Sequence, residues 1–309
     1  MWGKSTRLSP EAPVPIVNVF KSEKRLGGAA NVALNVQALG ATSLLCSVIG
    51  DDEAGADFIR LLEDNNLSTE GIIRSPERVT TVKQRILSGG QQLLRLDSEI
   101  ETDLLVHENR YLEQRFKDLL ERADVVIFQD YDKGVLGEQN IAELISLARQ
   151  KEVPTVVDPK KKNFLQYKGC SLFKPNLKEL KEGLKVDFAD ANHEAFEQAV
   201  VNLQTFLETP NIMVTLSERG IFCANGNEQT YINAHLRTIS DVSGAGDTVI
   251  SIAAVCMALN LPLPLLADLA NLGGGLVCEE IGVVPINKEK LYREAEESKI
   301  LAKYSALKV

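Results

Sequence analysis

Residues 241–260 read DVSGAGDTVISIAAVCMALN, a turn of small residues that leads directly into an apolar run with the composition of a helix. A helix that begins after two glycines leaves several backbone N–H groups without intrahelical partners, and its dipole adds partial positive charge there. The turn formed by Gly244, Ala245 and Gly246 is therefore suited to hold an anion. Asp247 falls in the first helical turn, where the dipole favours the ionised carboxylate.

An ionised carboxylate beside an anion-binding turn is the arrangement that phosphoryl transfer to an alcohol requires. The carboxylate accepts the hydroxyl proton, and the N–H groups stabilise charge on the moving phosphoryl group. The alternative is structural, because the glycines could merely start a buried helix that Asp247 caps. This stretch alone does not decide between the two, so the rest of the chain has to.

Composition excludes several classes of protein. The chain has 309 residues, of which 44% are hydrophobic, so it can bury one large core or two medium ones. A net charge of −9 argues against nucleic acid or an anionic membrane as the main partner. The five cysteines lack CxxC spacing, the three histidines lack metal-ligand spacing, and no run is long enough to span a bilayer. With no signal peptide at its start, the chain is expected to be cytoplasmic.

Strands and helices alternate along most of the chain. Short apolar runs predict buried strands at about 44–49, 125–129, 155–157, 171–173 and 212–216, and 221–224 with 229–232 predicts an antiparallel pair. Helical patterns lie at about 53–65, 104–122, 138–150, 192–208, 264–280 and 288–300. This alternation predicts one α/β domain with a mostly parallel sheet and helices on both faces.

Polar residues follow the predicted strands at their carboxyl ends. They are Asp130, Asp158, Asn176 and Ser217, and the segment 241–247 adds to them. Any one of them could be structural, since every strand has to end in something polar. Because ligands of open α/β sheets bind outside the carboxyl ends of the strands, the recurrence favours a common ligand crevice.

Two further segments are candidates for this crevice. Gly27 and Gly28 precede a helical pattern, so that a ligand can approach the backbone and Asn31 projects from the first turn, although plain helix–sheet packing is a fair alternative. Residues 80–87 and 92–97 alternate around Ser88-Gly89-Gly90 and predict a β-hairpin. This hairpin could be a lid that brings cations to a ligand, or an exposed hairpin that its cations keep soluble; the cations are Lys83, Arg85 and Arg95.

These motifs carry a family resemblance. DVSGAGDT (241–248) and GGAAN (27–31) resemble the two signatures of the ribokinase-like, phosphofructokinase B-type carbohydrate kinases. Within that family the chain is most similar to kinases of D-glycero-β-D-manno-heptose 7-phosphate, in stretches that run from about Gly3 to Ile286. Those stretches are RLSPEAPVPIV (7–17), GGAANVALN (27–35), QQLLRLDSE (91–99), DYDKGVL (130–136), DPKKKNF (158–164), KPNLKE (174–179) and DVSGAGDTVIS (241–251).

The resemblance implies a fold and a reaction. It implies a single ribokinase-like kinase domain over 1–309, with a small β lid from about 5–26 and 72–97. The family's first core strand is expected to be missing at the amino terminus. The implied reaction is ATP- and Mg²⁺-dependent phosphorylation of the heptose phosphate at its C1 hydroxyl, on the route to ADP-heptose and the lipopolysaccharide core. The alternatives are a kinase for another sugar or sugar phosphate, and a non-catalytic homologue that binds nucleotide or sugar.

The resemblance also assigns roles to residues. Asp247 is implied as the base, with Gly244, Ala245 and Gly246 as the anion hole. ATP is expected at Asn176, Leu177, Lys178, Glu179, Thr215, Ser217, Gly220 and Asn271. Substrate contacts are expected from Gly27, Gly28, Asn31, Lys83, Arg85, Asp130 and Lys133. No direct protein ligand is expected for Mg²⁺, which nucleotide phosphates would hold with Glu179 nearby. Expected partners are a second copy of the chain, as a homodimer, and a separate nucleotidyltransferase that acts downstream.

Overall fold

The computed structural model describes residues 1–226 and 228–304, so the last five residues of the predicted domain lie outside the description. A six-stranded sheet forms its centre, in the order β12-β11-β10-β9-β8-β7. Its strands are β7 (Val126–Gln129), β8 (Thr155–Asp158), β9 (Leu172–Phe173), β10 (Asn211–Thr215), β11 (Ile221–Asn225) and β12 (Glu228–Ile232). The pairs from β7 to β10 are parallel, and β11 and β12 are antiparallel. The mostly parallel sheet and its antiparallel end were both predicted.

Helices cover both faces of this sheet. Successive strand residues point to opposite faces, so Val156 packs in one core cluster and its neighbour Val157 in the other. The Val157 face is covered by α3 (Val106–Leu120), α4 (Glu138–Gln150), α5 (Leu177–Leu184) and α6 (His193–Leu207). The Val156 face is covered by α1 (Ala29–Ala38), α7 (Ala245–Ala258), α8 (Leu263–Val277) and α9 (Lys288–Glu297). The α/β class with helices on both faces is therefore confirmed.

A separate two-stranded parallel sheet lies beside the main one. It pairs β3 (Ser47–Gly50) with β4 (Ile72–Ser75), and α2 (Glu53–Asp64) connects them. The predicted strand 44–49 thus begins three residues later, and no described strand joins it to the six-stranded sheet. The lid was expected to begin again at 72, but Ile72 and Ile73 pack in small core clusters with the body. Their apolar side chains therefore place β4 outside the lid.

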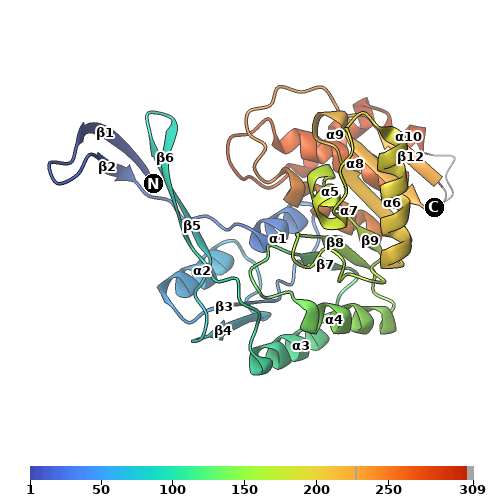
Figure 1. Ribbon diagram of the computed structural model, residues 1–309, viewed down its shortest axis with the longest axis horizontal. Coiled ribbons are helices and arrows are strands. Elements are labelled where there is room, and N and C mark those ends of the chain that lie inside the picture. The colour runs from blue at the N-terminus through green and yellow to red at the C-terminus, as the bar shows by residue number, and fades with distance from the viewer. Residues whose placement is uncertain (227, 305–309) are drawn as a thin grey trace.

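The lid is a four-stranded sheet that projects from the body of the molecule (Figure 1). Its order is β2-β1-β5-β6, with strands β1 (Trp2–Leu8), β2 (Pro15–Lys21), β5 (Val82–Ser88) and β6 (Gln91–Ser98). The predicted hairpin is confirmed in β5 and β6, whereas β1 was missed because its polar segment Lys4–Arg7 lacks a strand signal. Apolar side chains on the lid are exposed, and Phe20 reaches 75%.

The carboxyl-terminal segment packs against α8. A short helix, α10 (Ile300–Lys303), was not predicted. The buried carboxylate of Asp268 accepts hydrogen bonds from Lys303 Nζ (2.9 Å) and Tyr304 Oη (3.0 Å), which fixes this segment. Among the described residues no helix is long and apolar enough to cross a membrane.

Candidate active site

The start of α7 is an open anion-binding turn. Gly244 has φ +83°, a left-handed conformation that favours glycine. A Cβ added at Gly246 would meet nothing within 4 Å, so the space beside that residue is free. In the described part of the chain, no hydrogen-bond acceptor is found for the backbone N–H groups of Gly246 and Asp247. Two donors at a helix N-terminus therefore remain for an incoming anion, whereas the N–H of Ala245, which was also expected in the anion hole, donates to the Val242 carbonyl at 3.3 Å.

The Asp247 carboxylate is held by side chains from two other segments. Its Oδ2 accepts a hydrogen bond from Asn31 Nδ2 of α1 at 2.7 Å, and its Oδ1 accepts one from the Tyr131 hydroxyl at 2.8 Å. Helices α1 and α7 are fixed to each other by fully buried Asn35, whose Oδ1 accepts from Thr248 Oγ1 at 3.0 Å. Asn31, which was predicted to contact the substrate, is thus in direct contact with Asp247, the predicted base.

Burial raises the pKa of the Asp247 carboxyl above its ordinary value. The hydrogen bonds from Asn31 and Tyr131 oppose that rise, the charge of Asp158 adds to it, and the charge of Lys174 opposes it. Lys174 and Asp158 themselves form a buried ion pair with Nζ and Oδ1 3.0 Å apart. The result is a carboxylate with raised proton affinity and fixed orientation, which suits a general base.

The glycine pair before α1 faces Tyr131. Gly28 has φ +57° and ψ −134°, and a Cβ there would come within 3.3 Å of the Tyr131 ring. A Cβ at Gly27 would meet nothing within 4 Å. Gly28 is therefore required by both its backbone conformation and the close approach of the ring, while the backbone at Gly27 is open to a ligand.

Asp130 has a different surrounding from the one expected for a substrate ligand. It is only 2% exposed, and its Oδ1 accepts from the Asp132 backbone N–H at 2.8 Å. Its Oδ2 accepts from Asn163 Nδ2 at 3.0 Å and from the Tyr167 hydroxyl at 2.7 Å. Both oxygens already have partners within the protein, so Asp130 organises the loop that carries Tyr131.

The predicted nucleotide segment begins α5. Asn176 Oδ1 accepts from Glu179 N at 2.8 Å, and Glu179 Oε2 accepts from Asn176 N at 2.9 Å, which forms a capping box. The other oxygen of Glu179 accepts from Lys160 Nζ. Of the two residues between them, Leu177 packs against the core and the Lys178 side chain is 81% exposed. Asn176 and Glu179 thus face the strand ends, whereas the two middle side chains do not.

The remaining nucleotide candidates lie at the next strand end. Thr215 ends β10 and forms a bridge with Asn176, so the two segments are adjacent. Ser217 has φ +55° and Gly220 has φ +90°. There is no room for a Cβ at Gly220, because it would lie 2.0 Å from the Ile232 carbonyl oxygen. Asn271 of α8 is buried and donates to the Asn233 carbonyl at 2.8 Å.

The three predicted substrate cations differ in their partners. Lys83 lies 3.8 Å from Asp97 and 3.2 Å from Glu99. Lys133 contacts the same Glu99 at 2.8 Å, and Glu101 at 2.6 Å. Arg85 is exposed and forms no ion pair with any described residue. Of the three, Arg85 alone therefore has no ion-pair partner among the described residues, although its charge lowers the pKa of the Asp97 and Asp241 carboxyls.

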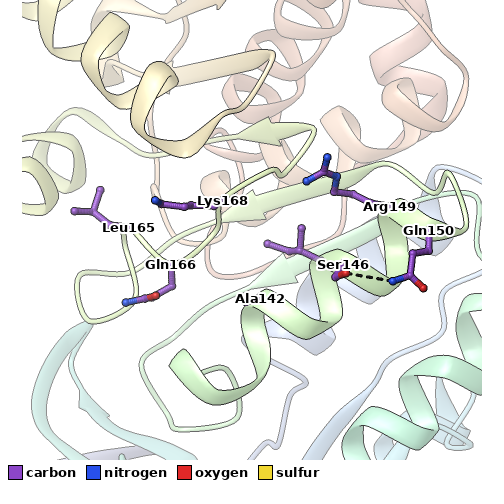
Figure 2. Close-up of a pocket in the computed structure, with 8 residues that line it drawn as sticks. Ala142, Ser146, Arg149, Gln150, Leu165, Gln166 and Lys168 are labelled. Atoms are coloured by element: carbon purple, nitrogen blue, oxygen red, sulfur yellow. Dashed lines mark hydrogen bonds between the residues drawn. The ribbon is translucent and has the colours of Figure 1, made fainter.

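A cavity of about 480 Å³ lies elsewhere, between α4 and residues 165–168 (Figure 2). No carboxylate lines it, and it contains no residue of the site described above. Its lining comprises Ala142, Ile145, Ser146, Arg149, Gln150, Leu165, Gln166 and Lys168. We therefore locate the chemistry at the strand ends and not in this cavity.

Sequence reasoning left several residues of the crevice out of the site. They are Tyr131, Lys160 and Lys174, and Asp158 was noted only as a polar strand end. Each lies within two residues of the carboxyl end of a parallel strand, so a stricter use of that rule would have found them. Among the described residues no group of three or more His, Cys, Asp or Glu is placed to hold a metal ion.

Comparison with known proteins gives a family match. A family model described as pfkB family carbohydrate kinase matches residues 2–290. The bifunctional protein HldE of Coxiella burnetii (strain Dugway) is 40% identical over 94% of this chain and 60% of its own length. HldE of Syntrophotalea carbinolica is 36% identical over 94% of this chain and 59% of its own. The chain thus spans about three fifths of these relatives.

A solved structure shows the same fold. Phosphofructokinase-2 from Escherichia coli, in complex with potassium, superposes with a TM-score of 0.76 over 98% of this chain and 95% of its own. The two sequences are 18% identical, so this likeness supports the ribokinase-like fold alone.

Proposed function

The chain belongs to the pfkB family of carbohydrate kinases, and from that premise we propose that it phosphorylates D-glycero-β-D-manno-heptose 7-phosphate at the C1 hydroxyl. The phosphoryl donor is ATP, and the product is the 1,7-bisphosphate on the route to ADP-heptose and the lipopolysaccharide core. The observation that carries a kinase role is the Asp247 carboxylate, fixed beside two backbone N–H groups without partners. Identity to HldE proteins along 94% of the chain supports the heptose phosphate.

In the proposed mechanism Asp247 takes the proton of the acceptor hydroxyl as the sugar oxygen bonds to the terminal phosphorus of ATP. The bond from that phosphorus to the bridging oxygen breaks, and ADP leaves. The N–H groups of Gly246 and Asp247 stabilise the charge on the transferring group. The raised pKa of Asp247 gives it a better driving force for accepting the proton than an exposed aspartate has.

We place the nucleotide along the strand ends from Asn176 to Gly220, with its adenine near Asn271. This placement is supported by the contact of Thr215 with Asn176, which brings the two strand ends together. Both carboxylate oxygens of Glu179 are hydrogen-bonded to protein groups, so Mg²⁺ is expected on the nucleotide phosphates with Glu179 nearby. The ion neutralises phosphate charge when it is bound.

The 7-phosphate is expected to bind the lid cations. Arg85 is the first candidate, because it is exposed without an ion pair to a described residue and a guanidinium can bind phosphate with two hydrogen bonds. Lys83 and Lys133 both form ion pairs with Glu99, so a phosphate that bound them would compete with that carboxylate. The sugar itself is expected to contact Gly27, Gly28 and Asn31, the last of which is hydrogen-bonded to Asp247.

The lid also supports a proposal on assembly. Leu8, Phe20 and Leu94 are 63%, 75% and 49% exposed on this small sheet, an apolar surface that a second copy could cover. We therefore propose a homodimer that acts in the cytoplasm. The relatives are named bifunctional, and we propose that adenylyl transfer to the product belongs to a nucleotidyltransferase outside residues 1–309.

A transfer assay with labelled ATP tests the function. Heptose 7-phosphate is compared with fructose 6-phosphate, fructose and ribose, with product identified by the position of the new phosphate. The proposal predicts that kcat/KM is highest for the heptose phosphate and that label appears at C1. Faster transfer to another sugar would replace the substrate but keep the kinase. ATP binding without transfer to any sugar would favour a non-catalytic homologue.

A further inference from the structure

Tyr131 contacts the proposed base, although neither its spacing nor any motif assigned it a role. It lies in the loop between β7 and α4, and its hydroxyl donates to Asp247 Oδ1 at 2.8 Å. We propose that Tyr131 is a positioning residue for proton abstraction, which holds the Asp247 carboxylate in place and in its ionised form. This inference rests on the proposed role of Asp247 as the base.

The loop that carries Tyr131 is fixed from several sides. The residues on either side of it are joined, because Asp130 accepts from the backbone N–H of Asp132. Arg78 donates to the carbonyl oxygens of Thr102 at 3.2 Å and Lys133 at 2.7 Å. A loop with this many fixed backbone groups places its side chain in one position, and a preorganised contact is what catalysis requires.

The Tyr131 hydroxyl acts as a donor throughout the working pH range. Burial and the charge of Asp247 raise the pKa of the phenol far above its ordinary value, so it does not ionise. Each carboxylate oxygen can accept more than one hydrogen bond. The acceptor hydroxyl of a sugar can therefore reach Asp247 while Tyr131 and Asn31 stay in contact with it.

Four groups from different segments act on the charge of Asp247. Asn31 of α1 and the Tyr131 hydroxyl donate to it, Lys174 after β9 attracts it, and Asp158 at the end of β8 repels it. Without the Tyr131 hydroxyl, only Asn31 and Lys174 oppose the rise that burial and Asp158 cause in the pKa of Asp247. The proton affinity of the carboxylate then rises, and its orientation is held from one side only.

Replacing Tyr131 with Phe tests the proposal, because it keeps the ring that packs near Gly28 and removes only the donor. The matched control is Tyr231→Phe, which removes a phenol donating at 3.0 Å to Glu197 at the surface, away from this site. For Tyr131→Phe we expect kcat to fall about ten- to hundredfold, the range for loss of a hydrogen bond to a charged group. The acid limb of kcat should move to higher pH, with KM for ATP unchanged.

A second measurement does not need the substrate. Carboxyl ¹³C resonances of the aspartate-labelled protein are followed with pH, and Asp247 is assigned by its absence in Asp247→Asn. The Asp247 carboxyl should titrate at higher pH in Tyr131→Phe than in the parent or in Tyr231→Phe. An unchanged titration together with an unchanged acid limb would overturn the proposal. If heptose phosphate is not the substrate, this titration still decides the role of Tyr131, so the two failures stay distinct.

Discussion

The Lys174 ammonium and the Asp158 carboxylate lie 3.0 Å apart, and the two side chains are only 3% and 7% exposed. Lys174 follows β9 and Asp158 ends the neighbouring strand β8, and both act on the charge of Asp247. A buried charge that loses its partner is costly, because the protein interior solvates it poorly. The pair therefore links the stability of the sheet to the electrostatics of the site.

Replacing Lys174 with Met leaves Asp158 buried without its cation. We expect the free energy of unfolding to fall by about 3–5 kcal/mol, the usual effect of breaking a buried pair. Urea denaturation measures it. Lys178→Met is the control, since that lysine is 81% exposed, and it should change stability by less than about 0.5 kcal/mol. Equal stability of the two variants would show that the buried pair is not stabilising.

Replacing Asp247 with Asn removes the proposed base while keeping its size. Turnover should fall by about two to four orders of magnitude, as for loss of a general base, while ATP binding measured by calorimetry is kept. The variant should be no less stable than the parent, because it removes a carboxylate that burial disfavours in its ionised form. Unchanged turnover would exclude Asp247 as the base.

The pH dependence of the reaction follows from the raised pKa of Asp247. The base works only when it is ionised, so kcat/KM falls as pH decreases through the pKa of the free enzyme. Because burial raises that pKa above 3.8, the acid limb should lie above the range of exposed aspartates. Initial rates between pH 4 and 8 at saturating ATP measure it, and the limb should be absent in Asp247→Asn. An acid limb at or below the ordinary aspartate range would contradict this assignment.

Replacing Arg85 with Ala tests the site for the sugar phosphate group. We expect KM for the phosphorylated sugar to rise about ten- to hundredfold with little change in kcat, since the contact is remote from the reacting oxygen. Arg95 lies opposite Arg85 on β6 but is held by Asp97 at 2.8 and 2.6 Å. Arg95→Ala is therefore a matched control that should leave KM within about twofold. Similar effects from both variants would point to general charge and not to a site.

Replacing Gly246 with Ala separates stability from activity. An added Cβ meets no atom within 4 Å, and alanine favours a helix, so the melting temperature should stay the same or rise. The methyl group occupies space beside the free N–H groups, where the transferring phosphoryl group is expected, so kcat should fall at least tenfold. Thermal unfolding and turnover are measured on the same preparation. A fully active variant would place the phosphoryl group elsewhere.

Much of this fold could be predicted because the chain alternates strongly. Asp130, Asp158 and Asn176 lie at or just after the ends of strands that are short apolar runs, and the carboxyl-end rule then brings those residues to one edge of the sheet. Strand β1 could not be predicted, since its middle residues Lys4–Arg7 are polar and its stability comes from pairing with β2 and β5. Local pattern holds no information on such long-range pairing.

For the site, contacts within one motif could be predicted, and contacts between distant segments could not. Gly244, Gly246 and Asp247 lie within one motif, so their proximity follows from the chain itself. The contact of Tyr131 with Asp247 joins residues 116 positions apart, and it depends on how β7 and α7 are packed. Whether Lys83 and Lys133 have partners could not be inferred either, because Glu99 approaches them only in the folded protein.

Glu99 contacts Lys83 on the lid and Lys133 in the loop that bears Tyr131. It is therefore an electrostatic tether between the lid and the reacting centre. An anion that draws either lysine away loosens this tether, whereas a neutral sugar leaves it intact. The binding of a charged ligand and the attachment of the lid to the loop that bears Tyr131 are in this way coupled through the ion pairs of Glu99.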